Sequence, residues 1–113
     1  DVAKRICEAG EWRVTNLSLQ KILYILQMFY MGQNNGTPLI GEGFEAWDMG
    51  PVVPDIYHRA KIFGSAPVKD VFYEASEIAD HGMRRFIDES TNTLIKKTPG
   101  QLVATRRALA RPL

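Results

Sequence analysis

The most regular hydrophobic pattern in this chain lies between residues 17 and 33. Apolar side chains recur there at intervals of three and four residues, which places them on one face of an α-helix. Ile25 and Met28 widen the apolar arc, so we expect this helix to be central and mostly buried. The residues on its main apolar face are Leu19, Ile22, Leu23, Leu26, Phe29 and Tyr30.

Polar side chains within this helix are few, and they lie together. Gln20, Tyr24 and Gln27 share one narrow stripe, with Lys21 beside it. The segment GQNNG at residues 32–36 should end the helix, because glycine and asparagine tolerate a left-handed backbone. The chain therefore predicts a long apolar helix that carries a polar stripe.

Two helix starts have clear local signals. Thr15 or Asn16 suits the N-cap of the long helix, because a short side-chain oxygen can accept a hydrogen bond from the free amides of the next turn. Near the other end of the chain, Thr98 would cap a second helix, Pro99 would occupy its first position, and Gln101 would complete a capping box. That helix should continue through LVATRRAL.

Weaker patterns predict helices over residues 2–9, over 70–80, and from Met83 to about Leu94 or Ile95, with a break at Gly82. The residues expected to face inward are Val2, Ile6 and Ala9 in the first, Phe72, Ala75 and Ala79 in the second, and Met83, Phe86 and Ile87 in the third.

Residues 44–61, FEAWDMGPVVPDIYHRAK, concentrate aromatic residues and prolines. Proline disfavours the helical region in the residue before it, so Gly50 and Val53 should be extended. Pro54 suits the first position of a helix that closes at Gly64. This helix would have an apolar face of Val53, Ile56, Tyr57, Ala60 and Phe63 and an Asp55–Arg59 pair one turn apart.

These elements predict a mainly α fold. We expect a compact single helical domain over residues 1–113, with a small β element near residues 43–48. The composition agrees, because 45% hydrophobic and 24% charged residues are ordinary values for a folded domain. A chain of 113 residues suffices for one small core.

The number of cysteines and the lengths of the apolar runs indicate the cellular compartment. Cys7 is the single cysteine, so neither an internal disulfide nor a cysteine-based zinc site is expected, and a reducing compartment is favoured. The start DVAKRICEAGEW lacks the apolar core of a signal peptide, and no apolar run approaches the length that spans a membrane. We therefore expect a cytoplasmic protein.

No residue set predicts an enzyme, a metal site or a cofactor. His58 and His81 are the two histidines, and neither belongs to a metal-ligand motif. Cys7 lies in an apolar helical pattern and is expected to be a small core residue rather than a nucleophile. Glu45 and Asp48 lie in a turn-rich stretch, where surface or capping roles fit better than acid–base catalysis.

The charge is uneven along the chain. Residues 1–55 have a net charge of −3 and residues 56–113 a net charge of +4. This favours a small DNA-binding transcriptional regulator as an alternative function, although the positive charges are scattered and nucleic acid is not the expected partner. The basic residues concerned are Arg84, Arg85, Lys96, Lys97, Arg106, Arg107 and Arg111.

Trp47 and Tyr57 have two readings. In one, they fill the core, and the prolines fix a sharp entry into a helix. In the other, they are anchors on a preformed binding surface, since a backbone stiffened by proline loses little entropy on association. The pattern leaves both readings open.

Two motifs together resemble a known family. The run TNLSLQKILYILQMFY at residues 15–30 is similar to a first family motif, and FEAWDMGPVVPDIYHRAK at 44–61 is similar to a second, with Pro38-Leu39 between them. The chain resembles Panacea-domain proteins, the group that includes the SocA-like and GepA-like phage-associated antitoxins. The resemblance covers about residues 1–65 most specifically.

The resemblance implies an antitoxin that neutralises a cognate toxin by direct protein–protein contact, without enzymatic activity. For SocA-type members it also implies a proteolytic adaptor that delivers the toxin to the ClpXP protease. With the stiff aromatic segment, it suggests that Asn16 caps the central helix and that a partner-binding face lies beside it. The candidate residues of that face are Asn16, Gln20, Lys21, Tyr24, Trp47, Gly50, Pro51 and Tyr57.

One segment departs from the family pattern. After TPGQLVA, relatives continue with Thr-His and then a Trp, whereas this chain reads ATRRALARPL. Thr105 is present, but the His and the Trp are not. We therefore expect the tail after about residue 105 to be divergent, truncated or frameshifted.

Overall fold

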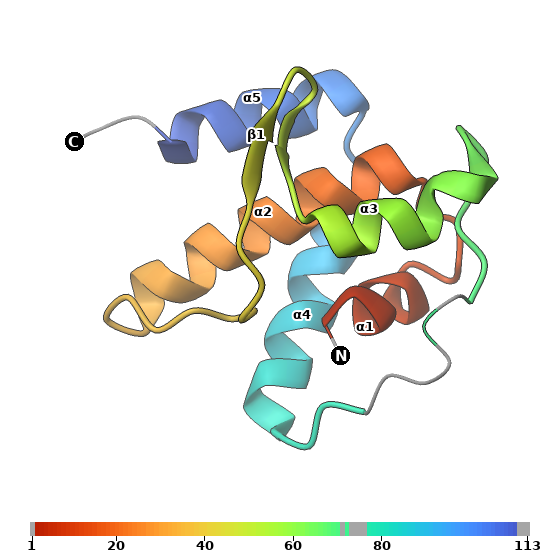
Figure 1. Ribbon diagram of the computed structural model, residues 1–113. Coiled ribbons are helices and arrows are strands. Elements are labelled where there is room, and N and C mark those ends of the chain that lie inside the picture. Colours follow the sequence, from red (N-terminus) through yellow and green to blue (C-terminus); the bar gives the residue numbers. More distant parts are fainter. Residues whose placement is uncertain (1, 71, 73–76, 111–113) are drawn as a thin grey trace.

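The computed structural model describes residues 2–70, 72 and 77–110. Within them the chain is mainly α-helical with one small antiparallel sheet, as the sequence predicts. The helix α2 runs through the middle, and the other elements lie around it (Figure 1). In chain order the elements are α1 (Val2–Ala9), α2 (Asn16–Gln33), β1 (Glu45–Trp47), β2 (Gly50–Val52), α3 (Pro54–Ala60), the 3-10 helix η1 (Lys61–Phe63), α4 (His81–Leu94) and α5 (Pro99–Ala110).

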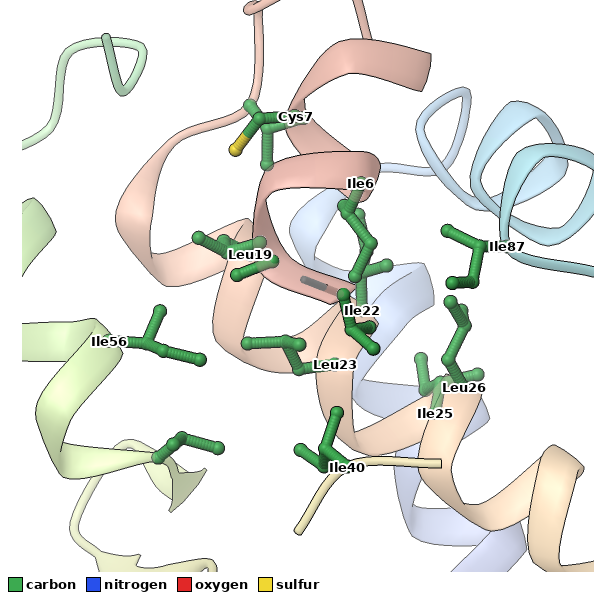
Figure 2. Close-up of a cluster of buried hydrophobic side chains, with 14 of the residues drawn as sticks. Ile6, Cys7, Leu19, Ile22, Leu23, Ile25, Leu26, Ile40, Ile56 and Ile87 are labelled. Carbon is green, nitrogen blue, oxygen red and sulfur yellow. The ribbon is translucent and has the colours of Figure 1, made fainter. Parts of the chain in front are cut away.

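The core forms where α2 meets its neighbours. Leu19, Ile22, Leu23 and Leu26 of α2 are fully enclosed, which confirms the predicted central helix. Figure 2 shows these side chains facing isoleucines from α1, α3 and α4 and from the segment before the hairpin. The facing residues are Ile6, Ile56, Ile87 and Ile40. Burial of this apolar surface is the main source of stability in such a fold.

Phe29 is the exception on the predicted apolar face. It is 38% exposed, so the expectation that it is buried is wrong. The last turns of α2 extend beyond α1 and α3, and less of the molecule covers them (Figure 1). Tyr30, its neighbour, is half-buried against Phe86 of α4, with ring centroids 5.6 Å apart.

The helix starts follow their local signals, with one correction. Thr15, not Asn16, is the N-cap of α2, and its hydroxyl accepts a hydrogen bond from the Ser18 amide at 3.2 Å. Asn16 is the first residue of the helix and its side chain turns inward, so it is unable to cap. In α5 the predicted capping box is present: the Gln101 amide donates to Oγ1 of Thr98, and the Thr98 amide donates to Oε1 of Gln101.

The hairpin that follows α2 contains more β structure than predicted. β1 lies in the expected region, and β2 pairs with it in antiparallel register, with Trp47 opposite Gly50 and Glu45 opposite Val52. The tight turn between them requires a φ of 109° at Gly50, which a residue with a side chain rarely adopts. Val53 is extended and α3 begins at Pro54, as predicted.

The segment before α4 differs from the prediction. Phe72 is buried, as expected, but residues 77–80 are not helical and Ala79 is exposed. The expected inward position of Ala75 lies outside the described residues. Instead of a break at Gly82, α4 already begins at His81, because Asp80 caps it and accepts from the Met83 amide at 3.0 Å.

Polar contacts join α1 to α4. The Arg5 guanidinium donates through Nε and Nη2 to the two carboxylate oxygens of Asp88, at 2.7 and 2.6 Å. This two-point pair fixes the relative position of the two helices, because both groups are planar. The predicted Asp55–Arg59 pair is not among the ion pairs within the described part of the chain.

Candidate partner-binding site

A chain of buried amides links α2 to the hairpin and α3. The Asn16 side chain donates to the carbonyl oxygen of Tyr57 at 3.1 Å, and its own oxygen accepts from Gln20 at 3.2 Å. Oε1 of Gln20 accepts from the Val53 amide at 2.9 Å. The first part of the predicted polar stripe therefore faces inward and holds the start of α3 against α2.

Gln27, further along α2, also binds the backbone of a neighbouring segment through its side chain. Its side-chain oxygen accepts from the backbone amides of Leu39 and Ile40, at 2.8 and 3.0 Å, and its nitrogen donates to the Ile40 carbonyl at 3.3 Å. Gln27 was placed on the stripe but not among the site residues. Its spacing of seven residues from Gln20, which returns to the same helix face, is the signal that connects the two.

The hairpin carries an aromatic cluster at its surface. The rings of Trp47 and Tyr57 meet edge to face, with centroids 4.9 Å apart. The centroid of the His58 ring lies 6.0 Å from that of Trp47 and 5.8 Å from that of Tyr57. The indole Nε1 of Trp47 donates to Oε1 of Glu45 at 3.0 Å. Trp47 and Tyr57 are half-buried against each other and are not part of the core cluster. We call Trp47, Tyr57 and His58 the hairpin aromatic cluster.

His58 was not among the predicted site residues. It follows Tyr57 directly in the chain, so no helical spacing connects it with Trp47. The turn of the hairpin brings Trp47 back over α3, and only this places the three rings together.

Tyr24 and Pro51 lie beside the same hairpin. Tyr24 is half-buried on α2 and meets Phe44 edge to face, with ring centroids 5.4 Å apart. Pro51 is half-buried in β2 opposite Ala46. The polar face of α2 and the hairpin thus form one continuous region, although only part of it is open to solvent.

Gly50 lies against a residue from the far end of the chain. Nη1 of Arg106 on α5 donates to the Met49 carbonyl at 3.2 Å. A Cβ at Gly50 would overlap the Arg106 guanidinium, but this is the end of a flexible side chain that can move, so it is the positive φ that favours glycine here. Sequence reasoning named Arg106 only as a scattered basic residue.

Lys21 lies on α2, the helix against which α5 packs. The residue is only 5% exposed, and within the described part of the chain it forms no hydrogen bond or ion pair. Burial lowers the pKa of its ammonium group, and the positive charge of Arg106 lowers it further. Among the described residues, Lys21 is thus a buried lysine without a carboxylate partner.

Neither a reactive cysteine nor a cluster of metal ligands is found in the described residues. Cys7 is enclosed in the core, as predicted, and burial raises the pKa of its thiol to about 12, which keeps it unreactive. Across residues 2–70, 72 and 77–110, no three His, Cys, Asp or Glu side chains are close enough to share a metal ion. In the same ranges no helix combines the length and apolar character needed to cross a bilayer.

The basic residues of the second half occupy several elements. Arg84 and Arg85 lie in α4, Lys96 and Lys97 in the turn after it, and Arg106 and Arg107 in α5. Arg111 lies outside the described residues. Of this group, Arg106 donates a hydrogen bond to the Met49 carbonyl.

Comparison with known proteins identifies the family. Residues 19–105 match the family model described as "Antitoxin SocA-like, Panacea domain". The chain belongs to this family. The match extends from α2 through the hairpin, α3 and α4 into α5, and it ends at Thr105, directly before Arg106. The resemblance inferred from the two motifs is confirmed.

A curated relative agrees with this assignment. The chain is 30% identical over 109 residues to a protein named Antitoxin SocA from Caulobacter vibrioides (strain NA1000 / CB15N). The alignment covers 88% of this chain and 57% of the relative, so the chain spans little more than half of that protein. No solved structure matches this SocA-like chain.

Proposed function

We propose that this SocA-like chain acts as an antitoxin, which neutralises a cognate toxin by direct protein–protein contact in the cytoplasm. Membership of the Antitoxin SocA-like family is the observation that carries the proposal. The match begins at Leu19 within the long helix and includes the whole hairpin region, so it covers the elements of the candidate binding face except the first turn with Asn16.

The geometry of the hairpin supports a binding role. Gln20 and Gln27 fix the backbone on both sides of the hairpin through buried hydrogen bonds. A surface that is already rigid loses little conformational entropy on association, and partly exposed Trp and Tyr side chains are frequent anchors in protein interfaces. We propose that the hairpin aromatic cluster contacts the toxin, while Asn16 and Gln20 support it from inside.

Co-expression with the product of the adjacent open reading frame tests the function. We expect that product to arrest growth when expressed alone, and this chain to restore growth and to co-purify with it as a complex. The proposal is wrong if a demonstrated toxin at that locus is neither bound nor neutralised.

A pair of matched variants tests the face. Trp47→Ala removes an anchor from the hairpin, and Phe29→Ala removes an exposed aromatic ring from the far end of α2. We expect Trp47→Ala to weaken toxin binding by about tenfold or more, as for a central interface aromatic, and Phe29→Ala to bind like wild type. Equal affinities, measured by calorimetry on folded variants, would exclude the hairpin face.

The finer proposal is that the chain also delivers the toxin to the ClpXP protease. It predicts that purified protease degrades the toxin faster when this chain is present, in an ATP-dependent manner. A toxin that is inhibited but remains intact under these conditions would indicate simple sequestration.

A further inference from the structure

The hairpin lies in an acidic stretch of the chain. Residues 22–58 contain four carboxylates and no lysine or arginine, so this stretch has a net charge of −4 with histidine neutral. The four residues are exposed, and in the described part of the chain none of them belongs to an ion pair. They are Glu42, Glu45, Asp48 and Asp55. A partner that covers this surface has to supply the compensating positive charge.

Glu45 connects this charge to the hairpin aromatic cluster. The indole Nε1 of Trp47 donates to Oε1 of Glu45 at 3.0 Å, which holds the carboxylate beside the ring. A carboxylate can accept about four hydrogen bonds, so one bond from the indole leaves most of this capacity for a ligand. Because Glu45 is exposed, a group that approaches from solvent can reach it.

The other two rings of the cluster lie on one side of Trp47. The centroids of the three rings are separated by 4.9, 5.8 and 6.0 Å, which makes a nearly equilateral triangle. Tyr57 and His58 therefore do not enclose the indole between them. Trp47 is half-buried, so part of its ring remains open to solvent, next to the carboxylate of Glu45.

The arginines of this chain that border the hairpin do not pair with Glu45. Arg59 follows His58 on α3 and is exposed, and Arg106 donates to the Met49 carbonyl at 3.2 Å. Neither arginine forms an ion pair with Glu45 within the described residues. The carboxylate can therefore pair with a cation from another molecule.

We propose that Trp47 and Glu45 together form a receptor for one arginine side chain of the toxin. The inference rests on the proposed function, because it names the chemistry by which the hairpin aromatic cluster recognises its partner. A guanidinium is planar, so it can lie against the indole, where the electron-rich face of the ring attracts a cation. The same guanidinium has five N–H donors, and a carboxylate beside the ring can accept from them.

Other occupants fit these residues less well. Nucleic-acid phosphate would be repelled by the negative charge of residues 22–58. An apolar side chain over Trp47 would remove Glu45 from water without neutralising it, which is costly. A lysine ammonium could neutralise Glu45, but it does not combine planar stacking with two parallel donors.

The neighbouring carboxylates strengthen the attraction at longer range. Asp48 follows Trp47 directly in the chain, and Asp55 lies in the first turn of α3, two residues before Tyr57. Their negative potential should attract a basic partner before contact and raise the association rate. The direct contact with Trp47 and Glu45 should mainly slow dissociation.

A titration with a small probe tests the receptor without the toxin. The chain has two tryptophans, so the indole N–H signal of Trp12, in the turn between α1 and α2, is an internal control in the NMR spectrum. N-acetyl-arginine amide should shift the Trp47 signal and not the Trp12 signal, and Glu45→Gln should abolish the shift. N-acetyl-citrulline amide has a similar shape without the charge and should shift neither signal. Equal shifts by the two probes, or no shift of Trp47 by the arginine probe, overturn the receptor.

Toxin binding provides the second test. Glu45→Gln removes the charge but keeps an oxygen that can accept from Trp47, and we expect it to weaken toxin binding by about tenfold. Added salt should weaken the wild-type complex more than the complex of this variant, because salt screens charge attraction. Glu89→Gln on α4 is the matched control and should bind like wild type, since Glu89 is also exposed and has no ion pair within the described residues.

The outcomes separate the receptor from the proposed function. If wild type does not bind the toxin, the proposed function is wrong, and the probe titration alone decides about the receptor. If wild type binds the toxin, equal affinity of Glu45→Gln at low salt overturns the receptor and leaves the proposed function standing. The receptor is also overturned if duplex DNA, or a second copy of this chain, binds at the hairpin and Trp47→Ala abolishes that binding. Restoration of binding to Glu45→Arg by an Arg→Glu change in the toxin would identify the arginine.

Discussion

The backbone amide of Val53 donates a hydrogen bond of 2.9 Å to Oε1 of Gln20. Val53 is the residue between the hairpin and α3, so neither the sheet nor the helix supplies an acceptor for its amide. A buried amide without a partner is costly, and Gln20, which is 1% exposed, satisfies it from the central helix. One side chain therefore positions the junction on which the candidate binding face depends.

Replacing Gln20 tests this role. Gln20→Met preserves the approximate size of the side chain and leaves the Val53 amide unpaired, so we expect the free energy of unfolding to fall by about 1–3 kcal/mol. Gln33→Met, at an exposed position at the end of α2, is the control and should stay within about 0.5 kcal/mol of wild type. Urea unfolding measures the free energy of unfolding of both variants. An equal decrease in the two would show that Gln20 has no special function.

Gly50 should tolerate no side chain. Alanine there must adopt a φ near 109° and would displace the Arg106 guanidinium, so we expect Gly50→Ala to lower the free energy of unfolding by about 1–3 kcal/mol. A Cβ at Gly43 meets no atom within 4 Å, and Gly43→Ala is the matched control. Thermal unfolding of the two variants decides between a conformational requirement and a general effect of mutation in the loop.

The Arg5–Asp88 pair should contribute measurably to the packing of α1 on α4. Both side chains are partly exposed, which limits the coupling energy to about 1 kcal/mol despite the two-point geometry. A double-mutant cycle with Arg5→Ala and Asp88→Ala measures it. Arg5→Lys should lose most of the coupling, because an ammonium group does not present two parallel donors. Full coupling in Arg5→Lys would show that charge alone suffices.

Cys7 should react only when the core opens. Because burial raises the pKa of its thiol to about 12, the native chain holds this proton at pH values where the unfolded chain has already lost it. Stability relative to Cys7→Ala should therefore decrease as the pH rises above the ordinary thiol pKa of 9.0. At pH 8 a thiol reagent should modify Cys7 no faster than the chain unfolds, and rapid modification would contradict its enclosure.

Lys21 should give the opposite pH dependence. Its folded-state pKa is lowered from 10.5, so above that lowered value the native chain releases a proton that the unfolded chain still holds. Stability of wild type relative to Lys21→Met should therefore rise with pH up to about 10.5, and the deficit should be greatest at lower pH. Denaturant unfolding at several pH values measures the difference. A constant difference would show that the Lys21 ammonium is well solvated in the folded chain.

Signals between residues close together in the chain determined where several helices form and where they begin. The three- and four-residue spacing of α2, the proline at the start of α3 and the capping box of Thr98 and Gln101 all act within one or two turns. These signals need no long-range contact to operate, and the structure confirms them. Thr15 and Asn16 both suited the N-cap of α2. Thr15 occupies that position, because the side-chain amide of Asn16 donates instead to the carbonyl oxygen of Tyr57.

The motifs also determined the family, but they did not show how the predicted site is built. Gln20, Lys21 and Tyr24 were expected to present polar groups and Asn16 to cap the helix, whereas Asn16, Gln20 and Lys21 are buried and Tyr24 is half-buried. Helical spacing assigns residues to one face, yet it does not reveal what covers that face. The hairpin, α3 and α5 pack against α2, and the hydrogen bonds of this face join residues 33 and 41 positions apart, Gln20 with Val53 and Asn16 with Tyr57. Only tertiary packing could therefore turn two amides into internal supports and leave Lys21 buried without an ion pair to any described residue.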